Sequence, residues 1–120
     1  MRDRDVDWLG ISFEDLRDFP PDAVRDAGYQ IRKVQQDREP DDWKPMNTVG
    51  PGVREITITE ESGEFRVLYV VKIKDWVHVL HCFQKKTRAT PQRDIDLAKT
   101  RYRRLEATIQ AARKKMKKGK

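Results

Sequence analysis

Apolar and polar residues alternate along three segments in the second half of the chain, which is typical of half-buried β-strands. The segments comprise residues 53–59, 65–73 and 76–83. The polar connections between them are short enough for β-hairpins. In the first segment Arg54 falls on one face, and Glu55 and Thr57 share the other. The pattern predicts a three-stranded antiparallel meander with one apolar and one polar face.

Two helical segments precede the strands. Ser12, which is followed by acidic residues, is expected to cap a short helix that ends at Pro20. Residues 22–37 carry apolar side chains at helical spacing, and Gly28 among them indicates close packing of another backbone. The two segments predict an N-terminal helical hairpin. The prolines and glycines of residues 39–52 predict a connecting loop without regular structure.

A long helix is predicted after the strands, with Thr90 as N-cap and Pro91 at its first position. Residues 113–120 are almost entirely basic, and we expect a flexible tail there. A single α+β domain over residues 1–120 follows. The helix has an apolar seam at alternating spacings of three and four, which should cover the core: Ile95, Ala98, Tyr102, Leu105, Ile109, Ala112 and Met116.

Charge is divided unevenly along the chain. Residues 1–42 hold seven Lys/Arg against twelve Asp/Glu, whereas residues 43–120 hold nineteen against eight. A basic half attracts polyanions through counterion release, so RNA, DNA or the ribosome surface is the expected class of partner, ahead of an acidic protein. The only cysteine, Cys82, can form no intramolecular disulfide. A cytoplasmic location is expected because neither a secretory signal nor a membrane-spanning apolar run is present.

The third strand segment runs directly into Lys85, Lys86 and Arg88, a pattern that favours a rigid phosphate-facing site. The two lysines should point to opposite sides if the strand continues through them. His78 and His81, three apart on a strand, are expected to face opposite ways and so cannot act as a neighbouring pair. No ligand set, phosphate-binding glycine loop or dinucleotide fingerprint indicates a metal or organic cofactor.

Several segments together resemble the phage-derived, HigB-type branch of the RelE/ParE toxin superfamily. They are residues 43–46 (Trp-Lys-Pro-Met), 50–56, 65–69 (Phe-Arg-Val-Leu-Tyr), 80–87 and 94–98, in addition to the Trp-Leu-Gly opening at Trp8. The resemblance implies a curved antiparallel sheet of three or four strands with helices packed against it. It also implies the toxin of a type II toxin–antitoxin pair.

The resemblance leaves three functions open. RelE and HigB relatives cleave messenger RNA on the ribosome without a metal, and this is the leading expectation. A ParE-like relative would inhibit DNA gyrase instead, and a degenerate relative would retain only antitoxin binding. The implied partners are messenger RNA, the ribosome and a cognate helix-turn-helix antitoxin. Operator DNA would be bound only through the antitoxin. No membrane is implied.

The catalytic residues expected on this basis are Arg66, Lys85, Lys86 and Glu55. Arg66 matches the family's strand arginine and would stabilise charge on the phosphate, while Glu55 is the nearest candidate general base. A surface ion pair of Arg66 with Glu55 or Glu64 is the alternative. Relatives often carry arginine where this chain has Thr57.

The expected RNA-binding residues are Arg54, Arg88, Tyr69 and Phe83. For Tyr69 and Phe83, packing in the core is the alternative. His81 and Cys82 are expected to be structural.

Overall fold

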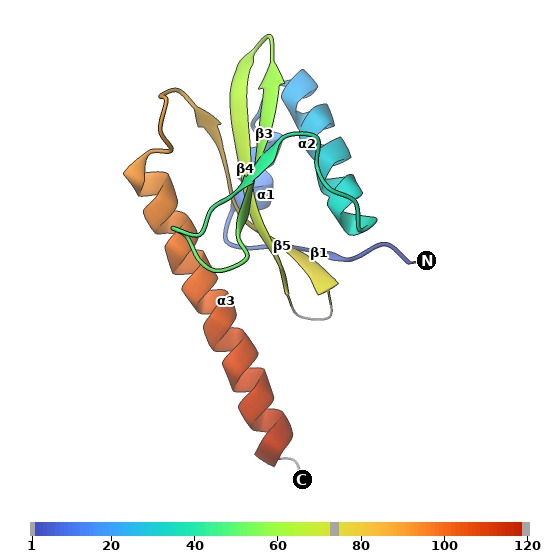
Figure 1. Cartoon of the computed structure of the whole chain (residues 1–120), viewed down its shortest axis with the longest axis vertical. Coiled ribbons are helices and arrows are strands. Elements are labelled where there is room, and N and C mark those ends of the chain that lie inside the picture. The colour runs from blue at the N-terminus through green and yellow to red at the C-terminus, as the bar shows by residue number, and fades with distance from the viewer. Residues whose placement is uncertain (1, 73–74, 119–120) are drawn as a thin grey trace.

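The sheet at the centre of the molecule has five strands in the order β1-β5-β4-β3-β2 (Figure 1). The computed structural model describes residues 2–72 and 75–118. The strands are β1 (Val6–Trp8), β2 (Trp43–Pro45), β3 (Arg54–Glu60), β4 (Gly63–Lys72) and β5 (Trp76–Lys85). Neighbouring strands are antiparallel except β1, which pairs with β5 in parallel. The meander predicted from the sequence is confirmed as β3-β4-β5.

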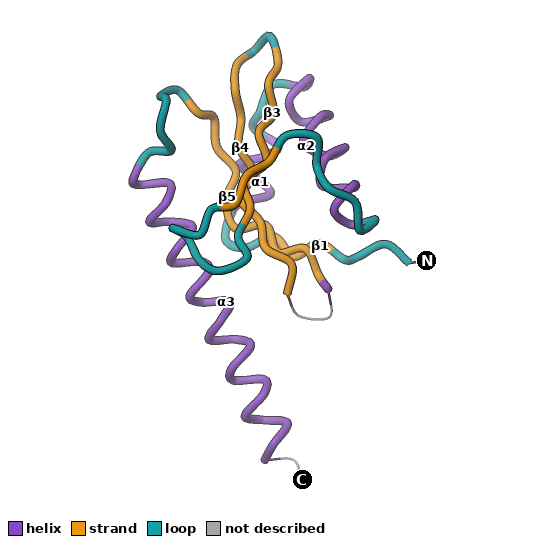
Figure 2. Tube along the Cα trace, viewed as in Figure 1, coloured by secondary structure: helices purple, strands orange, loops and turns teal. Residues whose placement is uncertain are grey.

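Helices cover both faces of this sheet (Figures 1 and 2). On one face α1 (Ser12–Arg17), α2 (Pro21–Gln35) and the connection between them bury side chains against the sheet, among them Leu16, Phe19 and Ile31 against Ile56, Phe65 and Val79. On the other face α3 (Gln92–Lys118) packs on Leu68, Val70 and Leu80. The sheet therefore separates two cores. None of the helices in the described parts of the chain is long and apolar enough to cross a bilayer.

Both additional strands were missed by sequence reasoning. β2 lies inside the segment for which no regular structure was predicted, and it pairs with the edge of β3. Pro45 is tolerated there because an edge strand leaves one row of N–H groups unused. β1 is only three residues long, too short for a visible alternation. The sheet is therefore mixed and larger than the three or four antiparallel strands expected.

The two N-terminal helices exist as predicted, but each packs chiefly on the sheet. Ser12 does not cap α1: its hydroxyl donates to the carbonyl of Val79 at 3.2 Å, and Ile11 occupies the N-cap position. Gly28 is exposed and has open space around its α-carbon, so the close packing predicted for it is absent. Close approach occurs instead at Gly10, where an added Cβ would lie 2.6 Å from Nε of Arg101.

The seam of α3 is buried from Ala98 to Ile109, as predicted, but Met116 is exposed. Thr90 does not cap this helix, because its hydroxyl donates to Glu55 and the helix begins at Gln92. Residues 113–118 continue α3 as helix, and the last two residues of the predicted tail lie outside the described residues. The flexibility expected of this end stays a prediction.

A β-bulge changes the facing of the two histidines. The register between β4 and β5 shifts at Leu68/Tyr69, so that Leu68 pairs with His81 while Tyr69 pairs with Val79. Leu80 is the extra residue, and His78 and His81 consequently lie on the same face of the sheet. The predicted opposite facing was wrong.

Candidate nucleic-acid interface

Cationic side chains gather where β5 ends. Lys85 is the last residue of β5, and Lys86, Thr87 and Arg88 follow it in the loop toward α3. Together with Glu64 they line one surface hollow. Glu64 is the cross-strand partner of Lys85. Because β5 stops at Lys85, both lysines line the same hollow rather than opposite sides of a continuing strand. Three cations against one carboxylate give the hollow a positive charge.

Arg66 does not line this hollow but contacts Glu64, which does, and only 7% of its surface is exposed. Its Nη1 donates to Oε1 of Glu55 at 2.6 Å, and its Nη2 donates to Oε1 of Glu64. Its Nε is buried and has no hydrogen-bond partner among the described residues. The guanidinium therefore donates to two carboxylates: that of Glu55, which is buried, and that of Glu64, which borders the hollow.

Glu55 is completely buried, although it lies on the face of β3 that was predicted to be polar. Its Oε2 accepts a hydrogen bond of 3.0 Å from the hydroxyl of Thr90, and Nζ of Lys44 lies 3.7 Å from its Oε1. A general base has to reach the hydroxyl from which it takes a proton. In this arrangement Glu55 holds Arg66 in place and does not open onto the hollow.

Glu64 carries a negative charge at neutral pH. The hydrogen bond from Arg66 lowers the pKa of its carboxyl more than partial burial raises it, and the nearby charges of Lys85 and Lys44 lower it further. Sequence reasoning gave Glu64 only as a possible surface partner of Arg66. The hairpin register, which sets Glu64 beside Lys85, is the signal that indicates its place in the site.

Arg54 and Tyr69 lie on the opposite face of the sheet from Arg66. They are cross-strand partners, and the guanidinium carbon of Arg54 stands 4.0 Å from the ring centre of Trp43. Tyr69 is 2% exposed, and burial raises the pKa of its hydroxyl more than Arg54 lowers it. The structure therefore does not bring these two RNA-binding candidates together with the hollow.

Phe83 is the cross-strand partner of Arg66 and is buried. Its ring stacks on that of His81, with 5.1 Å between ring centres. Both rings pack in the core beside α3, so Phe83 offers no open face to a base. Cys82 faces the other core, and burial raises the pKa of its thiol, which keeps it from acting as a nucleophile.

His81 belongs to a buried polar network that the sequence did not reveal. Its Nε2 lies 2.7 Å from Oδ1 of Asp94, and Nη1 of Arg101 lies 3.4 Å from its Nδ1 and 2.8 Å from the carbonyl of Leu80. Since Arg101 can only donate, Nδ1 accepts and Nε2 carries the proton. Arg101 thereby satisfies the carbonyl of the bulge residue and ties α3 to β5.

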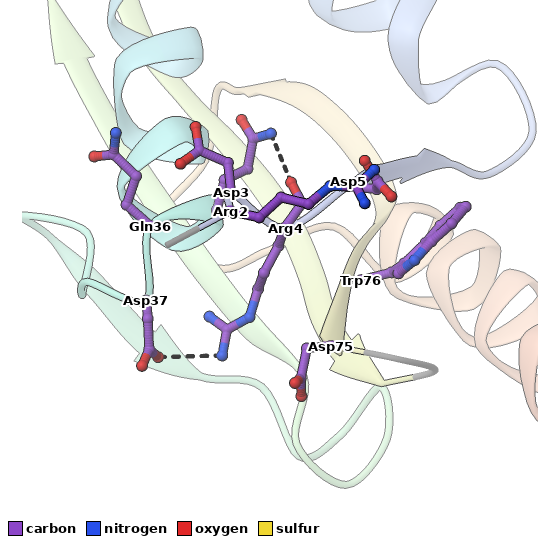
Figure 3. A pocket seen from close by; sticks show the side chains of 9 residues that line it. Arg2, Asp3, Arg4, Asp5, Gln36, Asp37, Asp75 and Trp76 are labelled. Atoms are coloured by element: carbon purple, nitrogen blue, oxygen red, sulfur yellow. Dashed lines mark hydrogen bonds and ion pairs between the residues drawn. The ribbon is translucent and has the colours of Figure 1, made fainter.

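A larger hollow lies at the other end of β5, around Arg4 and Trp76 (Figure 3). Nη2 of Arg4 pairs with Asp37 at 3.1 Å, and the side-chain amide of Gln35 donates to the carbonyl of Arg4. Two arginines and four aspartates line it, so its charge is negative. It does not suit a phosphate, in contrast to the hollow at Lys85, where three cations face one carboxylate.

Residues 14–103 match the family model of the phage-derived protein Gp49-like (DUF891). The matched region extends from α1 into the first half of α3 and contains every residue that lines the cationic hollow. Comparison with curated proteins and with solved structures gave no match.

Proposed function

Because the chain belongs to the phage-derived Gp49-like family, which is associated with toxins of toxin–antitoxin pairs, we propose that it is such a toxin and that it cleaves messenger RNA on the ribosome. The segments at residues 43–46, 65–69 and 80–87 support the finer assignment to the HigB-type branch of the RelE/ParE superfamily. A helix-turn-helix antitoxin would neutralise the toxin and carry it to operator DNA.

The observation that carries this proposal is the convergence of Lys85, Lys86 and Arg88 on one hollow, to which Arg66 is linked through Glu64. Cleavage of RNA without a metal requires cations that hold the scissile phosphate and stabilise its added negative charge. The lysines and Arg88 hold the backbone on either side, and Arg66 offers a planar fork to the phosphate itself. Thr57, directly opposite Arg66, provides no further cation.

Burial of Glu55 favours a second candidate, a toxin that inhibits DNA gyrase without cleaving RNA. A carboxylate locked between Arg66 and Thr90 does not take a proton from a 2′-hydroxyl. In that case the cationic hollow would bind its target without chemistry. The two candidates differ in one readout, the integrity of messenger RNA in arrested cells.

The proposal is tested by inducing the chain in a bacterial host and mapping the 5′ ends of cellular messenger RNA. We expect growth arrest with new ends inside translated codons. The double variant Lys85→Ala/Lys86→Ala should lose both effects, whereas Arg25→Ala, at an exposed position of α2, should retain them. Arrest with intact messenger RNA and damaged DNA would replace the nuclease with the gyrase inhibitor.

A further inference from the structure

The carboxylate of Glu64 occupies the position in which the proposed function requires a phosphate. It accepts from Nη2 of Arg66, it stands opposite Lys85 in the sheet register, and it borders the hollow that Lys86 and Arg88 also line. A carboxylate and a phosphodiester each present two oxygens that share a negative charge. Both suit the same guanidinium fork.

The charges of the cluster permit an exchange of these two anions. Arg66 is buried between Glu55 and Glu64, so the three groups together carry one negative charge. If Glu64 leaves and a phosphodiester enters, that charge is restored. Leaving a buried guanidinium without its second anion is costly. The exchange avoids this cost because the phosphodiester replaces Glu64 at Nη2 while Glu55 keeps its bond to Nη1.

Glu64 is also the member of the cluster that is free to move. Its side chain is 40% exposed, against 8% for Arg66 and none for Glu55. It follows Gly63 at the hairpin between β3 and β4, where Gly63 has a φ of +137°. Rotation of its side chain into solvent breaks the contact with Arg66 and leaves the ladder between β4 and β5 in place.

We infer that Glu64 is an internal stand-in for the RNA phosphate, which closes the site in the free toxin and is displaced when an RNA backbone binds. This inference rests on the proposed function and deepens it. It makes Glu64 a residue that sets the affinity for RNA by competition, so that only a substrate held by the surrounding cations gains access to Arg66.

The test measures binding of a short single-stranded RNA with 2′-O-methyl groups, which resists cleavage, by fluorescence anisotropy over a range of salt concentrations. Glu64→Ala and Glu64→Gln should bind about tenfold more tightly than the parent chain, because one charge-assisted contact becomes free for phosphate. The dependence on salt should steepen, because the variants no longer have to break the ion pair between Arg66 and Glu64, which takes up ions, when RNA binds.

Glu61→Ala is the matched control, since it removes the same charge from an exposed position of the same hairpin. Equal affinity and slope for the Glu64 and Glu61 variants would overturn the inference. The proposed RNA site would survive that result if Lys85→Ala/Lys86→Ala still weakened binding. Equal binding by the parent chain, the lysine double variant and the Glu64 variants would overturn both. Thermal melting of each variant separates a loss of folding from a change in affinity. Glu64→Gln is included because its side-chain oxygen still offers Arg66 a hydrogen-bond acceptor.

Discussion

At the scale of single residues, the burial of Arg66 ties the candidate site to the stability of the fold. Its guanidinium neutralises Glu55, which is fully buried. Arg66→Ala would leave that carboxylate without its charged partner and should lower the free energy of unfolding by about 3 kcal/mol, as is usual when one member of a buried pair is removed. Chemical denaturation measures this loss.

Lys86→Ala provides the comparison, because Lys86 is exposed and its removal should change the free energy of unfolding by less than about 0.5 kcal/mol. A loss for Arg66→Ala as small as this would mean that the pair with Glu55 is not formed. Because Arg66→Ala is expected to lower stability, growth arrest alone cannot separate a loss of function from a loss of folding in that variant. The exposed lysines are the better variants for function.

His81 should make stability depend on pH. Burial lowers the pKa of its imidazole more than Asp94 raises it, and the charge of Arg101 lowers it further. The unfolded chain therefore takes up the proton more readily, and the free energy of unfolding should fall as pH drops below the ordinary imidazole value of about 6.5. Denaturation curves between pH 7.5 and roughly 5.5 test this. His81→Gln should flatten the dependence, and an unchanged slope in that variant would refute its origin in His81.

At the scale of elements, two glycines make opposite predictions. Gly28 lies inside α2 with open space around it, so Gly28→Ala should raise the free energy of unfolding by about 0.8 kcal/mol, the usual difference in helix propensity. Gly10 has a φ of +56° and faces Arg101, so Gly10→Ala should lower it by more than about 1 kcal/mol. Thermal melting of the two variants compares them directly, and equal effects would contradict the packing of Arg101 on Gly10.

The elements also show why sequence reasoning reached only part of the site. Alternation predicts β3, β4 and β5 because each is seven residues or longer. It does not register the bulge at Leu80, which is one extra residue in an apolar run, and so the facing of His78 and His81 was mistaken. Pairing within the β3-β4 hairpin brings Glu55, Glu64 and Arg66 together. The burial of Glu55 involves Thr90, which lies 35 residues further along the chain, and no local pattern reveals that contact.

At the scale of the whole molecule, the uneven distribution of charge along the sequence corresponds to the two faces of the sheet. The acidic first third of the chain supplies α1 and α2 on one face of the sheet, and the basic remainder supplies α3 on the other (Figure 1). The far end of α3 projects past the sheet, and Met116 there is 76% exposed. For the RNA binding proposed above, we expect a polyanion to approach the α3 face.

Removal of residues 113–120 tests this division. It deletes six of the 26 Lys/Arg, and the side chains of residues 113–116 are exposed, so the free energy of unfolding should change by less than about 0.5 kcal/mol. Non-specific binding of RNA should weaken, with a shallower dependence on salt. Unchanged RNA binding, or a chain that no longer folds, would show that the end of α3 has a different role.

The account as a whole is tested most directly by adding the purified chain to a translating cell-free extract with a reporter messenger RNA and locating the cuts by primer extension. The account predicts cuts within the coding region that appear with the parent chain and with Arg25→Ala, and that disappear with Lys85→Ala/Lys86→Ala. A reporter that stays intact, under conditions in which the parent chain arrests growth in cells, would contradict it.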